Sequence, residues 1–183
     1  MHNDFKPIVI RNIIILFDNV RSTLAVVTDQ QMQKTIHKWP LWKQFYHVLH
    51  SMDQWFINPA EYSHPALHEE GMHAFEGETT VIRSKGLSKT EITDYFELVA
   101  AKTLQHFKTL NAESLFEKPN GCPFIRLELV IGQMRHGMYN IGLIHEMLRE
   151  DTGKMPGSAR SGFAPGYQAR WSGSSAVIVR PRD

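Results

Sequence analysis

Histidine is the residue type that offers the most chemistry in this sequence, with ten copies among 183 residues. A neutral imidazole ring is a good ligand for transition metals, and it exchanges protons near neutral pH. His136 and Asn140 lie four residues apart in a stretch with helical period, and side chains with this spacing point the same way from a helix. The pair therefore predicts two ligand atoms directed at one metal ion, although an amide oxygen is a poor ligand for zinc or nickel.

A pair of histidines, His47 and His50, lies near the apolar face of an earlier predicted helix. Either ring can face the interior, and the residues alone do not decide between them. An inward histidine that only forms a hydrogen bond in the core is the more common case and is the alternative interpretation for both pairs.

The histidines between residues 64 and 73 do not form a helical metal motif. His68 and His73 resemble the metalloprotease helix motif, but their spacing is one residue too long, and Met72 occupies the position that a second ligand needs. His64 and His68 have the right spacing, but Pro65 allows at most the start of a helix there.

The period of the apolar residues predicts four long helices, over residues 7–33, 40–57, 88–110 and 123–150. Pro7 suits the first turn of the first helix. Its β-branched residues would also suit a strand, but its length and period favour a helix. Ser88 and Glu91 form a capping box at the start of the third helix.

The fourth helix carries an apolar series at helical spacing and is followed by glycine and proline stop signals at Gly153 and Pro156. We expect the following side chains to face inward: Leu127, Val130, Ile131, Met134, Met138, Ile141, Ile144 and Leu148.

Two segments lack a long period. Residues 58–87 are broken by proline and glycine and predict a long connection with a short helix over 66–73. Residues 151–183 predict an extended tail over the helices, with a short strand at 176–179. The predicted fold is a single all-α domain over residues 1–183, a four-helix bundle whose second and third helices are joined by the long connection.

Charge and hydropathy exclude several classes of partner. Twenty basic side chains against nineteen acidic ones give a net charge of +1 with no basic cluster, so we expect no nucleic-acid binding. The apolar run at 13–17 is too short to span a membrane, and no secretory cleavage site follows it. Cys122 is the single cysteine, which excludes an intramolecular disulfide and a cysteine-based zinc site. We expect a cytoplasmic protein without membrane contact.

Two segments carry a resemblance to a known family. Tyr-His-Val-Leu at 46–49, followed by Trp55, and the stretch 136–144 resemble the second-helix and last-helix motifs of the DinB-like (YfiT-like) metal-binding bundles. The segment Gln-Ala-Arg-Trp-Ser-Gly at 168–173 is similar to a tail segment of some members. The resemblance implies a four-helix bundle, a homodimer and a metal site with three histidine ligands.

The resemblance also implies which residues hold the metal. His47, rather than His50, matches the ligand of the second helix, and His136 matches the first histidine of the last helix. Gly142 matches the motif's glycine, but Asn140 stands where the family has its other histidine. The resemblance therefore implies an altered site of His47, His136 and Asn140, with zinc or nickel as the metal.

The function that this resemblance implies is a metal-dependent transferase or hydrolase acting on a small molecule, in which the metal lowers the pKa of a water molecule or a thiol. No general base is assigned, although Asp94, Glu97 and Gln133 lie on neighbouring predicted helices. The alternative is a non-catalytic bundle that has lost its metal and dimerises or binds a small molecule. Its pocket would be lined by four aromatic residues, Trp42, Tyr46, Trp55 and Tyr139.

Overall fold

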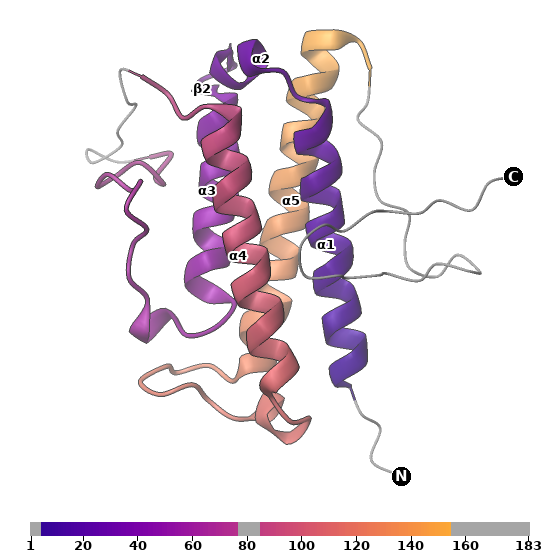
Figure 1. The fold of residues 1–183 in the computed structure, drawn as a ribbon, viewed down its shortest axis with the longest axis vertical. Coiled ribbons are helices and arrows are strands. Elements are labelled where there is room, and N and C mark those ends of the chain that lie inside the picture. The colour runs from indigo at the N-terminus through magenta and orange to yellow at the C-terminus, as the bar shows by residue number, and fades with distance from the viewer. Residues whose placement is uncertain (1–4, 77–84, 155–183) are drawn as a thin grey trace, which may run out of the picture.

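The structure is a computed structural model that describes residues 5–76 and 85–154. It is mostly helical, as predicted for an all-α protein. Four long helices lie side by side (Figure 1), and they span Lys6–Val26 (α1), Leu41–Trp55 (α3), Lys89–Thr109 (α4) and Arg126–Thr152 (α5). Helices α1 and α3 each pack against both α4 and α5.

Short elements fill the links between the long helices. They are α2 (Asp29–Gln33), a two-stranded antiparallel sheet of β1 (Thr35–Ile36) and β2 (Trp39–Pro40), and the 3-10 turns η1 (Pro59–Glu61) and η2 (Glu113–Phe116). Within residues 5–76 and 85–154, no helix combines the length and the apolar character needed to cross a membrane.

The core is built from the apolar faces that the period of the sequence predicts. On α1, Ile13, Phe17 and Val20 are almost fully buried. The ring of Phe17 meets those of Phe56 and Phe96 edge-on, with centroids 5.9 and 6.0 Å apart. These contacts join α1 to the end of α3 and to α4, so one aromatic cluster holds three of the segments together.

The prediction of one continuous first helix over 7–33 is wrong beyond Val26. Thr28 has an extended backbone, and its side chain accepts a hydrogen bond from the Gln31 amide while the Gln31 side chain accepts one from the Thr28 amide. This capping box begins a separate helix, α2, and ends the helical path of α1. The other predicted capping box, Ser88 with Glu91, is present at the start of α4.

The inward face of α5 differs in part from the prediction. Val130, Ile144 and other predicted residues are buried, but Ile131 and Met138 are 44% and 47% exposed. The reason lies at Gly137, where a Cβ atom would lie 2.6 Å from the Met52 side chain. Because α5 packs closely against α1 and α3 along this glycine, its inner face is turned away from Ile131 and Met138. The helix ends as predicted at Gly153, which adopts a left-handed conformation.

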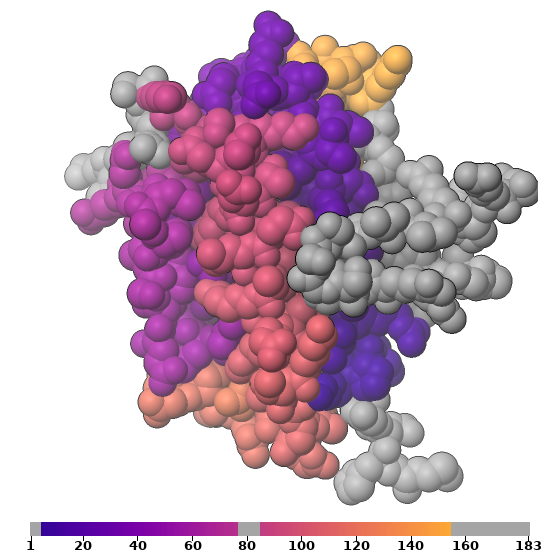
Figure 2. Space-filling model, in the orientation of Figure 1, coloured from indigo at the N-terminus to yellow at the C-terminus, as the bar shows by residue number. Residues whose placement is uncertain are grey.

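Residues 58–76, which form the described first part of the connection between α3 and α4, run beside α3 (Figures 1 and 2). The short helix predicted over 66–73 is absent, and turns closed by the carbonyls of Pro65, Glu69 and Gly71 take its place. Lys43 on α3 anchors the connection, because its ammonium group donates a hydrogen bond of 2.8 Å to the Met72 carbonyl. The predicted C-terminal tail beyond residue 154, with its strand at 176–179, lies outside the described residues.

Candidate metal-binding site

The two histidines predicted as ligands meet between α3 and α5. His47 projects from α3 and His136 from α5, and their Nε2 atoms lie 3.1 Å apart. Both rings are half-buried. Two nitrogens bound to one tetrahedral zinc ion, each at about 2.0–2.1 Å, lie about 3.3 Å apart. The spacing of the two rings therefore fits a pair of ligands on one ion.

A backbone contact determines the tautomer of His47. Its Nδ1 atom lies 2.7 Å from the carbonyl oxygen of His73, and a carbonyl can only accept a hydrogen bond. Nδ1 therefore carries the proton, and the Nε2 lone pair faces His136. A ring that donates one N–H to a backbone carbonyl and offers its other nitrogen is typical of a metal ligand.

Asn140 lies one turn after His136 and is buried. Its Nδ2 atom is 2.9 Å from the His136 carbonyl oxygen and 3.1 Å from His136 Nε2. The amide nitrogen, rather than the oxygen, thus faces the histidine pair, and the amide must turn over before its oxygen can reach an ion there. The structure brings the three predicted residues together, with Asn140 placed as a donor.

These contacts leave the histidine pair with an excess of lone pairs. If Asn140 donates to His136 Nε2, that atom is unprotonated, as is His47 Nε2 opposite it. Two facing lone pairs repel each other unless a proton or a cation lies between them. If His136 Nε2 is instead protonated, it cannot accept from Asn140. The Nδ1 atom of His136 is buried and has no hydrogen-bond partner among the described residues, so neither tautomer satisfies the ring.

Burial keeps both rings neutral near pH 7. It lowers the pKa of His136 to about 4, with a smaller contribution from the neighbouring His47. The pKa of His47 is also lowered, chiefly by burial, although its hydrogen bond to the His73 carbonyl opposes the shift. Neutral imidazole is the form that binds metals, so the site does not need to lose protons before binding.

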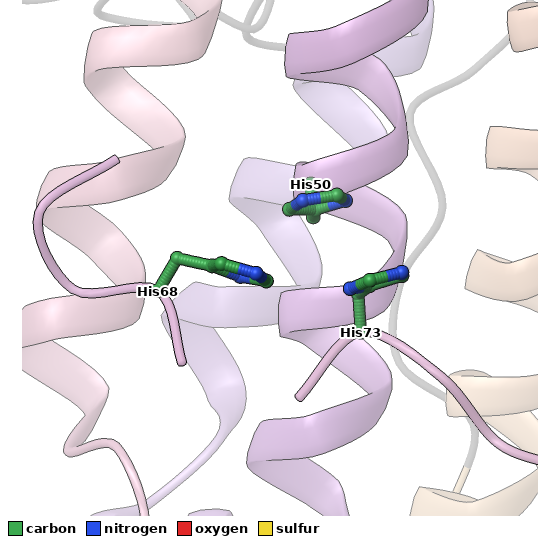
Figure 3. A group of neighbouring side chains, drawn as sticks. All are labelled: His50, His68 and His73. Carbon is green, nitrogen blue, oxygen red and sulfur yellow. The ribbon is translucent and has the colours of Figure 1, made fainter. Parts of the chain in front are cut away.

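Three further histidines gather beside this pair. His50 on α3 meets His68 and His73 of the connection (Figure 3), and one ligand atom from each lies within 4.8 Å of the others. This group was missed in the sequence, because helical spacing was the criterion and this segment forms turns instead of a helix. The signal that could have found it is the presence of three histidines between residues 64 and 73.

The residues considered as a general base have other partners or face solvent. Glu97 forms an ion pair with Arg21, Asp94 is exposed, and Gln133 accepts a hydrogen bond of 3.0 Å from the Ser51 hydroxyl. The structure therefore gives none of the three a catalytic role.

The structure does not support the aromatic pocket that the alternative hypothesis, a non-catalytic small-molecule-binding bundle, requires. Trp42 and Tyr46 are 2% and 0% exposed and belong to the core, whereas Tyr139 on α5 is 67% exposed. Trp55 is half-buried, so two of the four aromatic side chains lie in the core, one is half-buried and one is mostly exposed.

Comparison of the chain with family profiles, with curated proteins and with solved structures found no match. The functional assignment therefore depends on the geometry of the histidines and on the motifs of the sequence.

Proposed function

We propose that this protein is a DinB-like four-helix bundle that holds a divalent transition metal, zinc or nickel, between His47 on α3 and His136 on α5. The observation that carries the proposal is the 3.1 Å separation of the two Nε2 atoms. The hydrogen bond from His47 Nδ1 to the His73 carbonyl supports it, because it directs the Nε2 lone pair at the site.

The proposed activity is that of a metal-dependent transferase or hydrolase with a small-molecule substrate. A bound divalent ion would act there as a Lewis acid and lower the pKa of a water molecule or a substrate thiol. The chain's own residues hold and orient this centre. His73 fixes the tautomer of His47 through its carbonyl, and the Asn140 amide donates to the His136 carbonyl beside the site.

The same family resemblance supports a homodimer. Ile131 and Met138 lie seven residues apart on one face of α5 and are 44% and 47% exposed. Exposed large apolar side chains on one helix face are typical of a surface that pairs with another protein surface. We propose that a second copy of the chain covers it.

The experiment that tests the metal site is elemental analysis of untagged protein, with His136→Ala as the decisive variant. We expect one equivalent of zinc or nickel per chain to disappear in this variant. His37→Asn is the matched control, because His37 is an exposed histidine whose positive φ of 58° asparagine tolerates. An unchanged metal content in His136→Ala, or an equal loss in the control, would overturn the proposal.

A further inference from the structure

The connection places a second group of imidazole rings against α3, next to the His47–His136 pair. His50 stacks on His73 with centroids 4.5 Å apart, and His64 stacks on His68 at 3.9 Å. His50 also joins the two stacks, since its Nε2 atom lies 3.0 Å from His64 Nδ1. Four histidines thus form one compact cluster whose members come from two separate segments of the chain.

We propose that His50, His68 and His73 form a second transition-metal site, distinct from the His47–His136 pair. The ligand atoms of the first three residues lie within 4.8 Å of one another. A site with only imidazole nitrogens suits zinc, copper or nickel and not calcium or magnesium, which prefer oxygen ligands. Three imidazole ligands can hold a zinc ion and leave its fourth position to another ligand.

Burial keeps three rings of the cluster in the neutral form. Burial and the charges of the neighbouring histidines lower the pKa of His50 to about 3 and that of His68 to about 4. The pKa of His73 is also lowered, by burial first and then by the charges of His64 and Lys43. The rings of His50, His68 and His73 are therefore neutral near pH 7 and each has a lone pair that can bind a metal.

Hydrogen bonding leaves ring nitrogens available for that cation. The Nδ1 atom of His73 is buried without a hydrogen-bond partner among the described residues. The Nδ1 atom of His68 lies 2.6 Å from the Tyr46 hydroxyl. When His68 donates to that oxygen, its Nε2 atom is free to bind, which is the usual arrangement of a metal-bound histidine with a supporting partner.

A metal in this cluster would tie the connection to α3. The connection has turns in place of a helix over residues 62–76, so few of its own hydrogen bonds hold it in position. His73 links the two sites, because its carbonyl orients His47 while its ring belongs to the cluster. The second metal would therefore stabilise the connection and also help to position His47.

The test is equilibrium dialysis of metal-stripped protein against zinc chloride, followed by elemental analysis. We expect two zinc ions per chain in the wild type and in His37→Asn, and one in the double variant His68→Ala/His73→Ala. The His73 carbonyl survives this substitution, so its contact with His47 is retained. Two zinc ions in the double variant, or a single ion in the wild type that only His136→Ala removes, would overturn the second site.

The same measurement separates the two proposals. If the double variant loses one ion while His136→Ala loses none, the second site stands and the proposed function fails. The milder variant His68→Gln keeps a polar side chain near Tyr46 and guards against misfolding. Its zinc affinity at this site should fall by about tenfold or more, with an unchanged circular dichroism spectrum. An unchanged affinity would contradict the proposal.

Limited proteolysis provides a readout other than metal content. Zinc should protect residues 58–76 from cleavage in the wild type and not in the double variant, because only the wild type can clamp this segment to α3. Equal protection of both proteins by zinc would show that the cluster does not hold the connection.

Discussion

The ring of His136 has a lone pair from His47 on one side and the amide group of Asn140 on the other, both 3.1 Å from its Nε2 atom. At this position a third histidine would offer a lone pair to a metal, whereas Asn140 offers an N–H donor. In the proposed metal site, Asn140 stands where the family would have its other histidine, but it presents a donor and can contribute to orientation more readily than to metal binding.

Replacing Asn140 with histidine should therefore add a ligand. We expect Asn140→His to bind zinc at least about tenfold more tightly than the wild type, in competition with a chelator. Asn12→His on α1 is the control, because it adds a histidine on another helix, where the Asn12 amide donates to the Ile8 carbonyl of the same helix. An unchanged affinity in Asn140→His would mean that position 140 does not face the metal.

The burial of His145, outside the proposed metal site, makes the stability of the fold depend on pH. The Thr23 hydroxyl donates to the Asn19 carbonyl at 2.7 Å, so its oxygen accepts from His145 Nε2, also at 2.7 Å. Burial lowers the pKa of His145 below the usual 6.5. The folded state thus keeps this ring neutral, whereas the unfolded state takes up a proton as the pH falls below about 6.5.

The stability contribution of neutral His145 is complete above about pH 6.5 and is lost as the pH falls toward its folded-state pKa. The variant His145→Gln keeps a donor for Thr23 but cannot be protonated. We expect its melting temperature to fall less than that of the wild type between about pH 7.5 and about pH 5.5. Equal falls in the two proteins would contradict the assignment.

At the scale of the helices, the contact of α5 with α1 and α3 depends on Gly137. A Cβ atom at this position would lie 2.6 Å from Met52 Cε and 2.9 Å from Leu16 Cδ2. Both atoms end flexible side chains, so they can move, but the added volume separates helices that carry His47 and His136. The packing of α5 at Gly137 therefore affects the position of the neighbouring residue His136, which is a proposed metal ligand.

We expect Gly137→Ala to lower the free energy of unfolding by about 1–3 kcal/mol through overpacking, and to weaken metal binding at the same time. Gly132→Ala is the matched control on the same helix, because no atom lies within 4 Å of its Cβ position. Alanine there should stabilise the protein by about 0.5–1 kcal/mol. Urea unfolding and zinc titration of both variants measure these effects, and similar results for the two would refute the role of Gly137.

At the scale of the whole molecule, the outer side of α5 determines the expected assembly. We predict that light scattering will give the wild type a mass twice that of one chain. Met138→Glu should shift the protein toward monomer, because a charge at the interface opposes association. Leu98→Glu on α4 is the control, since Leu98 is 57% exposed on another helix. A monomeric wild type at micromolar concentration would contradict the homodimer.

The helices could largely be predicted from the sequence because their hydrogen bonds and caps are local. The capping box of Ser88 and Glu91 and the stop at Gly153 depend on residues within one turn, and both appear as predicted. The capping box at Thr28 is equally local, so the expectation of an unbroken helix over 7–33 overlooked a signal that was present.

The local part of the candidate site could be predicted from the sequence, and the part that depends on distant contacts could not. The four-residue spacing of His136 and Asn140 on one helix is a local property and was readable in the sequence. The meeting of His50 with His68 and His73 depends on where a turn-rich connection lies against α3, and this position is determined by distant contacts such as Lys43 with the Met72 carbonyl. Likewise, the face that α5 turns inward depends on its close approach at Gly137. Periodicity reports which residues share a face, but only packing against the other helices decides which face is buried.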